Sequence, residues 1–422
     1  MGVHSEVLST EPPPARRWRG AGALAALVLV VALGGAGTAI ALSGGGHSAG
    51  AARTPGSKST TPSTSSTGSR SSTTTAPPAP VNVTSMTPAP GSSSVPFGSD
   101  VTVTFSEPLA TSSPLPSLSP APPGSWVRVD PRTVRFVPNG FFSPFAKVQI
   151  TVPGGTSGVE SALGTHLGGT LTNSFTVAGG SELRLQQLLA ELDYLPVSFV
   201  PGTGTGTGGA SLTAAASAIS AEATVANQVS LSPVPGSFVW RFKNIPASLS
   251  ALWAPGQAGV ITTGAVMAFE AANGLATDGQ AGPAVWNALL AAVAARHVTS
   301  APYDYVYVSQ VLPETTYLWR DGSVIFSSLA NTGIPQSPTA VGTWPVYLRF
   351  TTTTMSGTNP DGSHYSDPGI PWVSYFNGGD ALHGFIRASY GFPQSLGCIE
   401  MPFASAATLW PMTPLGTLVT IL

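Results

Sequence analysis

Cys398 is the only cysteine in the 422-residue chain, and His383 precedes it by fifteen positions. A thiol attacks carbonyl carbon as the thiolate, and an unperturbed thiol with a pKa of about 8.5 is mostly protonated at neutral pH. His383 can act as the base that removes this proton. The backbone N–H groups of Gly397 and Cys398 can stabilise the oxyanion that forms. These residues predict a nucleophilic cysteine–histidine site.

A structural role for Cys398 is the alternative, because a lone cysteine is most often a small buried hydrophobe. Leu396, Ile399 and Met401 would supply apolar neighbours. We favour the nucleophile, because the His383-Gly384 pair accompanies Cys398 in an ordered motif. One cysteine also excludes an internal disulfide framework. The six histidines include no close pair with metal-ligand spacing, so we expect neither a metal nor another cofactor.

The N-terminal residues predict an exported protein. Arg16, Arg17 and Arg19 precede residues 20–42, which are apolar and uncharged and long enough to cross a bilayer about 30 Å thick. Arginines at this position favour a cytoplasmic segment 1–19 and an extracytoplasmic remainder. We therefore expect a single-pass anchor in the cell membrane. A cleaved signal peptide, giving a secreted protein, is the alternative, but its apolar region is usually shorter.

Residues 43–80 consist mainly of Ser, Thr, Gly, Pro and Ala, a composition that cannot bury enough apolar surface to fold. They form either an extended linker or a glycosylated stalk. The net charge of −2, with 9% charged residues, gives no polybasic footprint for nucleic acid.

Residues 81–178 predict an all-β sandwich, with alternating strands separated by turns rich in Pro and Gly. The strands are expected at residues 101–105, 126–129, 133–136, 147–152 and 174–177. The run from Thr104 to Leu109, with the closing strand, resembles bacterial Ig-like domains. We expect a spacer here.

Residues 181–297 predict three helices. The first carries leucines at helical spacing and stops at Pro196, the second ends at Gly274, and Gly282-Pro283 opens a third that buries Trp286. The pattern resembles the helical peptidoglycan-binding domain, with an insertion at about residues 198–258. Glycan binding and a purely structural packing role both remain open for this unit.

Residues 301–422 predict a β-rich domain with Asp321-Gly322 as a hairpin turn. Strands are expected at residues 305–308, 310–312, 316–319, 324–326, 346–350 and 417–422. Four motifs follow in order: residues 331–333, 339–344, 375–384 and 395–402. Together they resemble the L,D-transpeptidase catalytic domain, also called the YkuD-like domain. The whole chain is thus predicted to be multidomain: transmembrane helix, Ig-like sandwich, three-helix domain and YkuD-like domain.

The resemblance implies roles for individual residues. Cys398 would be the nucleophile, His383 the general base and acid, Gly384 the carbonyl that orients the imidazole, and Gly397 an oxyanion donor. Substrate contacts are expected from Ser395, Tyr375, Phe376, Arg387 and Glu400.

Two motif positions depart from the family pattern. Leu396 replaces the usual histidine before Gly-Cys, and Glu400 replaces the usual Arg or Asn. A carboxylate near the thiol raises its pKa. Arg387 could offset this charge by facing Glu400, or it could face a substrate carboxylate instead. If the departure is costly, Glu400→Arg should raise the rate of acylation.

The resemblance implies a peptidoglycan L,D-transpeptidase that forms 3→3 cross-links through a Cys398 thioester and releases D-alanine. Its partners would be stem peptides and glycan of the cell wall, and carbapenems should acylate Cys398. A hydrolase of the same fold and an impaired wall-binding scaffold are the alternatives. A sortase is disfavoured, because no Lys or Arg follows Cys398 to stabilise an oxyanion.

Overall fold

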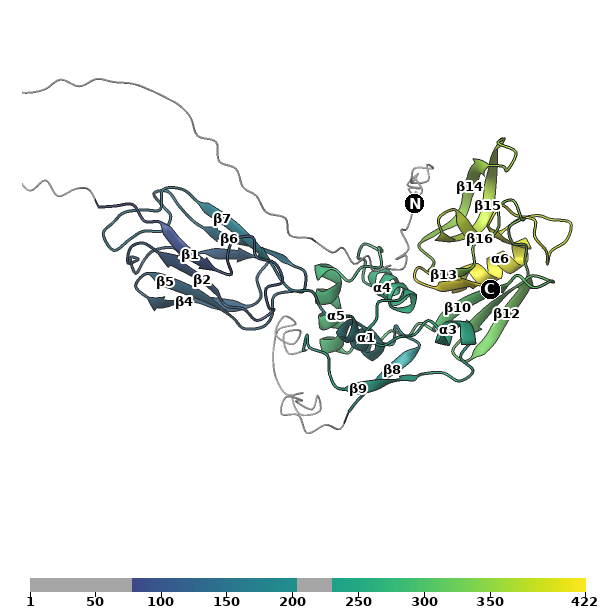
Figure 1. The fold of residues 1–422 in the computed structure, drawn as a ribbon, viewed down its shortest axis with the longest axis horizontal. Helices are drawn as coiled ribbons and strands as arrows, with labels where there is room; N and C mark the ends of the chain where they lie inside the picture. The colour runs from purple at the N-terminus through teal and green to yellow at the C-terminus, as the bar shows by residue number, and fades with distance from the viewer. Residues whose placement is uncertain (1–77, 203–229) are drawn as a thin grey trace, which may run out of the picture. The chain divides into compact units, whose positions relative to one another are not determined.

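The computed structural model describes residues 78–202 and 230–422 (Figure 1). The predicted cytoplasmic segment 1–19, the anchor 20–42 and nearly all of the linker 43–80 lie outside these residues. Within the described ranges, no helix is both long and apolar enough to span a membrane.

The first folded segment is a two-sheet sandwich. One sheet has the order β1-β2-β5-β4 and the other β3-β6-β7. Their bounds are Val83–Thr87 (β1), Val101–Phe105 (β2), Ser117–Ser119 (β3), Gly124–Asp130 (β4), Thr133–Pro138 (β5), Lys147–Val152 (β6) and Leu171–Thr176 (β7). Alternation in β2 buries Val101, Val103 and Phe105 between the sheets. The all-β prediction is confirmed, although β4 is an edge strand with Val127 and Val129 exposed.

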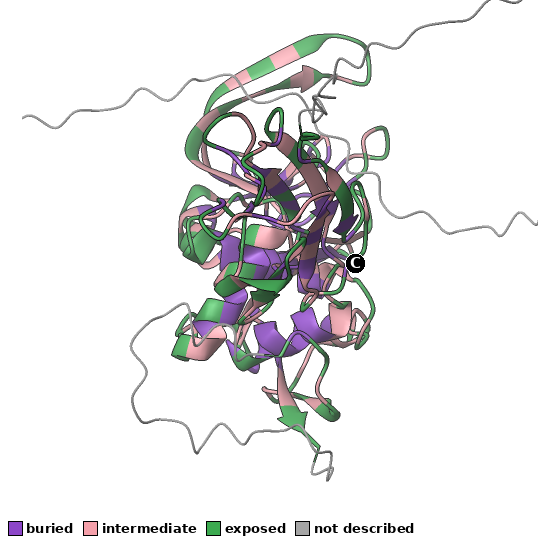
Figure 2. Cartoon of the chain, turned by 90° about the vertical axis from the view of Figure 1, so that its left-hand side faces the viewer, coloured by how far each residue is buried: buried purple, intermediate pink, exposed green. Residues whose placement is uncertain are grey.

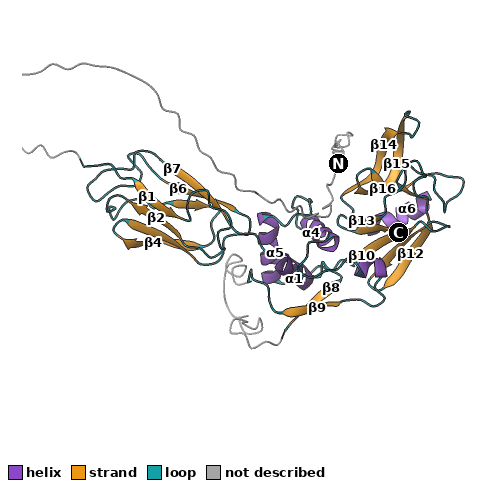
Figure 3. Ribbon diagram, in the orientation of Figure 1, coloured by secondary structure: helices purple, strands orange, loops and turns teal. Residues whose placement is uncertain are grey.

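Within the described part of the second segment, the three helices that the periodicity predicts are present (Figure 3). They are α1 (Glu182–Glu191), α4 (Val260–Ala272) and α5 (Pro283–Ala295). The Ser181 hydroxyl caps α1 by accepting from the Arg184 N–H at 3.2 Å. Pro283 opens α5, and Trp286 is 1% exposed in the core shared by the helices.

The described parts of the predicted insertion, before residue 203 and after residue 229, contain regular structure. Strand β8 (Val197–Pro201) pairs antiparallel with β9 (Gly236–Trp240), and the short helix α3 (Ala247–Ser250) follows. The aromatic rings of Phe199 and Phe238 pack across this ribbon, 5.3 Å apart. The insertion therefore adds a β-ribbon to the helical unit.

The C-terminal segment contains two sheets. One has the order β12-β11-β10-β18-β13 and the other β14-β15-β16-β17. Their bounds are Asp304–Ser309 (β10), Thr315–Arg320 (β11), Ser323–Leu329 (β12), Gly342–Pro345 (β13), Leu348–Thr358 (β14), His364–Asn377 (β15), Asp380–Gly384 (β16), Ile399–Met401 (β17) and Leu418–Ile421 (β18). Helix α6 (Phe403–Leu409) and a 3-10 turn (Trp410–Met412) complete the fold.

Most predicted strands of this segment form. Asp321 and Gly322 turn the chain between β11 and β12 with φ of 47° and 103°, conformations that suit such a hairpin. The strand expected at residues 310–312 is wrong. These residues form an irregular bend with Val311 77% exposed, so the short apolar run has no face to bury.

The hairpin β14–β15 is much longer than the short strand predicted at residues 346–350. Its distal half alternates exposed and half-buried residues, which Figure 2 shows as green and pink bands at the top of the view. Thr353, Thr354, Ser356 and Thr358 give the distal half of β14 a polar composition. It therefore lacks the hydrophobic alternation from which strands are recognised.

Candidate active site

Parallel pairing of β16 with β17 brings the catalytic candidates together. His383 lies opposite Glu400, and Leu382 lies opposite Ile399. Since successive side chains of a strand face opposite sides, Leu382 and Ile399 enter the core while His383 and Glu400 share the other face. Cys398 comes directly before β17 and packs in the cluster of Ala381, which lies on the same face of β16 as His383.

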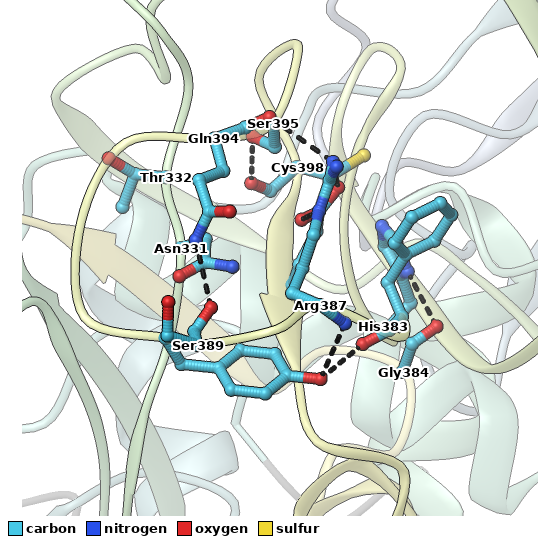
Figure 4. Close-up of polar contacts among 12 residues, drawn as sticks. Asn331, Thr332, His383, Gly384, Arg387, Ser389, Gln394, Ser395 and Cys398 are labelled. Carbon is cyan, nitrogen blue, oxygen red and sulfur yellow. Dashed lines mark hydrogen bonds and ion pairs between the residues drawn. The ribbon is translucent and has the colours of Figure 1, made fainter.

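The His383 imidazole is held as a neutral base. Its Nδ1 lies 3.1 Å from the Gly384 carbonyl oxygen, as predicted for the orienting residue (Figure 4). Because a carbonyl only accepts, Nδ1 carries the hydrogen and Nε2 keeps its lone pair. The side chain is 3% exposed, and this burial lowers the pKa of His383.

The Cys398 thiol is also neutral at rest. Burial is the main cause that raises the pKa of Cys398 to about 12; the Ala381 N–H opposes this shift, while the charges of Asp380 and Glu400 add to it. The residue is partly exposed, and its Sγ donates to the Gly379 carbonyl at 3.6 Å. Among the described residues, no hydrogen bond joins Sγ to His383. Catalytic hydrogen bonds often tighten only when substrate binds.

Side-chain hydroxyls fix the loop that carries Cys398. The Ser395 hydroxyl donates to the Cys398 carbonyl at 2.6 Å and accepts from the Gly397 N–H at 3.1 Å. Thr339 Oγ1 donates to the Gly397 carbonyl at 2.8 Å, and Ser337 Oγ donates to the Leu396 carbonyl at 2.8 Å. These bonds hold the nucleophile in a preorganised position.

This loop geometry corrects two predicted roles. Ser395 is 1% exposed and bonds to its own loop, so it supports the turn instead of contacting substrate. The Gly397 N–H, expected to donate to the oxyanion, is occupied by Ser395. The Cys398 N–H has no hydrogen-bond partner within the part of the chain that the structure describes. It is the better oxyanion donor.

Tyr375 and Phe376 face opposite sides of β15. Tyr375 packs in the cluster that includes Cys398, and burial, followed by the charge of Cys398, raises the pKa of Tyr375 to about 12. Phe376 is 2% exposed and packs against Trp344 in the core. The predicted substrate contact is wrong for Phe376, because adjacent strand residues cannot share a face.

Arg387 and Glu400 bind each other. Arg387 Nε and Nη2 donate to the two Glu400 carboxylate oxygens at 2.7 and 2.8 Å, a bidentate pair. Arg387 Nη2 also donates to the Gln394 carbonyl at 3.2 Å, and its guanidinium lies over the Phe385 ring. Of the two roles considered for Arg387, the structure therefore has it facing Glu400. Each charged group is thus paired with the other, and the predicted substrate contacts of both residues stay predictions.

Asp380 is a site residue that the sequence reasoning missed. Its Oδ2 accepts from the Asn377 side chain at 3.2 Å, and burial raises the pKa of Asp380 to about 6. A Cβ placed on Gly397 would lie 2.4 Å from Asp380 Oδ1, so this oxygen occupies the space beside the nucleophile loop. In the sequence, Asp380 follows Gly378-Gly379, a pattern typical of a turn. The pattern therefore gives no signal that Asp380 belongs to the site.

Metal-ligating side chains do not gather here. No group of three or more His, Cys, Asp or Glu residues with metal-binding geometry occurs within residues 78–202 and 230–422.

Several solved structures resemble the chain. An L,D-transpeptidase from Mycobacterium smegmatis has 13% identity and a TM-score of 0.26, covering 82% of this chain and 100% of its own. L,D-transpeptidase 3 from Mycobacterium tuberculosis has 14% identity and a TM-score of 0.26, covering 81% and 98%. The catalytic domain of an E. faecium L,D-transpeptidase has 25% identity and a TM-score of 0.27, covering 29% and 100%. No curated protein matches the sequence.

Family models assign the three folded segments separately. Residues 77–177 match the bacterial Ig-like domain, and residues 248–289 match the peptidoglycan binding domain, which here covers α3, α4 and most of α5 but not α1. Residues 303–421 match the L,D-transpeptidase catalytic domain of the YkuD type. The chain therefore combines a bacterial Ig-like domain and a peptidoglycan-binding-type domain with a C-terminal catalytic domain of the L,D-transpeptidase family.

Proposed function

We propose that this protein is a peptidoglycan L,D-transpeptidase that forms 3→3 cross-links through a Cys398 thioester. The observation that carries the proposal is the placement of Cys398 and His383 on one face of the β16–β17 pair, with His383 Nδ1 bound to the Gly384 carbonyl. This placement lies within the segment that matches the L,D-transpeptidase catalytic domain. It leaves a basic nitrogen and a nucleophilic sulfur on the same side of the sheet.

The neutral state of both groups shapes the first step. Because the pKa of Cys398 is raised and that of His383 is lowered, a thiolate–imidazolium pair is not formed in advance. His383 Nε2 removes the proton as sulfur attacks the carbonyl carbon of the donor stem peptide. The Cys398 N–H then donates to the oxyanion, and one such donor contributes about 3–4 kcal/mol.

Collapse of this intermediate completes acylation. The C–N bond to D-alanine breaks, and His383 returns its proton to the departing amine. An amine of a second stem peptide then attacks the thioester, and sulfur leaves. Attack by water in place of this amine would make the enzyme a hydrolase.

The proposed location follows from the N-terminal residues. We propose that residues 20–42 anchor the chain in the cell membrane and that the domains after the linker face the cell wall, where the peptidoglycan-binding-type domain would meet glycan. Secretion after cleavage near Ala41 would also deliver the enzyme to its substrate.

Acylation by a carbapenem tests the assignment of the nucleophile. The full chain is incubated with the β-lactam and its intact mass is measured, together with Cys398→Ala and, as a matched control at an exposed position between β14 and β15, Asp361→Asn. We expect one carbapenem per chain in the parent and in the control, and none in Cys398→Ala. An unmodified parent, or an adduct that persists without Cys398, would reject the proposal.

A further inference from the structure

Asp380 places a carboxylate in the site without a cation to neutralise it. Its hydrogen bond is to the neutral Asn377 amide, and no ion pair to Asp380 exists in the described ranges. Arg387 is bound to Glu400. Arg349 donates to the Trp410 carbonyl and lies over the Trp410 ring. Neither arginine is therefore available to Asp380.

The carboxylate lies beside the loop that carries the reacting sulfur. Asp380 Oδ1 takes the space that a side chain at Gly397 would fill, and Cys398 is the next residue. The charge of Asp380 acts on the Cys398 thiol and on the Tyr347 hydroxyl. The titratable groups around Cys398 are Tyr347, Tyr365, Tyr375 and Glu400, together with the neutral base His383, and none of them is cationic.

Asp380 hinders the first half of the reaction. A negative charge beside a thiol disfavours the thiolate and so opposes attack on the donor. The second half of the reaction, in which the acceptor attacks the thioester, benefits from a negative charge. The acceptor is a primary amine, which is an ammonium ion at neutral pH because its ordinary pKa is near that of lysine, about 10.4. A carboxylate beside the thioester can bind this ammonium group through charge-assisted hydrogen bonds.

We propose that Asp380 binds the ammonium group of the acceptor stem peptide and directs it to the Cys398 thioester. This inference rests on the proposed function and specifies its acceptor as a cationic primary amine. Asp380 accepts one proton from the ammonium, which leaves a neutral amine with a lone pair. The amine nitrogen then bonds to the acyl carbon, and the C–S bond breaks with its electron pair on sulfur.

The remaining protons are accounted for by His383 and solvent. The attacking nitrogen loses its second proton to His383 Nε2, and His383 passes this proton to the sulfur to restore the neutral thiol. Asp380 releases its own proton to water. The same carboxylate gives incoming water no comparable advantage, because water carries no positive charge. Asp380 thereby favours transfer over hydrolysis.

The test compares two acceptors of different charge on the full chain. The donor is a tetrapeptide stem with both its α-amine and its side-chain amine acetylated, so that it cannot act as acceptor. The acceptors are an unblocked stem peptide, whose amine is cationic at pH 7, and hydroxylamine, which is neutral at that pH. Products are quantified by mass spectrometry for the parent, Asp380→Asn, Asp380→Glu and the control Asp361→Asn, a residue of the β14–β15 turn. Acylation by a carbapenem is measured in parallel.

In Asp380→Asn we expect transfer to the stem peptide to fall about tenfold or more relative to transfer to hydroxylamine, the scale of one lost charged hydrogen bond. Carbapenem acylation should be at least as fast as in the parent, Asp380→Glu should recover part of the transfer, and Asp361→Asn should behave as the parent. An unchanged acceptor ratio in Asp380→Asn would overturn the inference while leaving the proposed function intact. A parallel loss of acylation and of both acceptor reactions would also overturn it, since Asp380 would then serve only structure. A parent that is never acylated would reject the proposed function and this inference with it.

Discussion

The Arg387–Glu400 pair gives a sharp test, because the motif and the structure make opposite predictions for Glu400→Arg. From the motif, arginine restores the usual residue and should speed acylation. In the structure, the new guanidinium would meet Arg387, whose Nε and Nη2 lie 2.7 and 2.8 Å from the carboxylate being removed. Two like charges would then share a site with little water.

The burial of the two side chains determines how much free energy of unfolding is lost when the pair is broken. The Glu400 side chain is 6% exposed and that of Arg387 is 30% exposed. Removing one partner of a fully buried pair costs about 3–5 kcal/mol, whereas exposed pairs contribute about 0–1 kcal/mol. Since Arg387 keeps some solvent and its bond to Gln394, we expect Glu400→Gln to lower the free energy of unfolding by about 2–3 kcal/mol. Glu400→Arg should lower it further.

Calorimetric unfolding of the full chain provides the assay, with carbapenem acylation measured on the same samples. The expected loss corresponds to a Tm decrease of roughly 4–12 °C in the transition that contains the catalytic domain. The swapped variant Arg387→Glu/Glu400→Arg should regain part of this Tm, because the pair is restored with reversed charges. If Glu400→Arg keeps the parent Tm and is acylated faster, the reasoning from the ion pair is refuted and the motif-based expectation is right.

Three further predictions follow from the site. The rate of Cys398 alkylation by iodoacetamide should keep rising above pH 9, because the raised pKa of Cys398 moves thiolate formation beyond that of an ordinary thiol at about 8.5; a plateau below pH 7.5 would indicate a preformed ion pair. Gly397→Ala should lose acylation, because the backbone φ of 126° disfavours a side chain and a Cβ at this position would lie 2.4 Å from Asp380 Oδ1. Unchanged acylation would show that the loop tolerates a side chain at position 397. Phe376→Ala should lower the free energy of unfolding by about 3–5 kcal/mol while Tyr375→Phe changes it by less than about 1 kcal/mol, as measured by denaturant titration; equal losses would contradict the opposite orientations of the two rings.

Local patterns predicted most of the elements. Helices α1, α4 and α5 follow from leucine spacing, the end at Gly274 and the start at Gly282-Pro283, and the turn at Asp321-Gly322 follows from its residue types. The β14–β15 hairpin was missed, because its polar distal half has no hydrophobic face from which a strand can be recognised. The expected anchor and linker lie outside the described residues and stay predictions.

In the site, sequence order identified Cys398 and His383, but contacts decided the neighbouring roles. Phe376 and Tyr375 are equally aromatic in sequence, and only the orientation of β15 separates a core residue from a site residue. Ser395 and Arg387 are polar and close to the motif, yet both are occupied by partners from their own domain. Asp380 was not predicted, and the structure adds it to the site. Its position beside Gly397 depends on how strand β16 packs against a loop distant in sequence.

Product analysis with a tetrapeptide stem tests the central claim most directly. The full chain is incubated with unblocked tetrapeptide, and the products are identified by mass spectrometry beside those of Cys398→Ala. We predict a cross-linked dimer in which the donor has lost D-alanine and is joined through its diamino acid to the side-chain amine of the acceptor, with no dimer from Cys398→Ala. Release of D-alanine with only tripeptide as product would identify a hydrolase, and a dimer formed without Cys398 would contradict the account.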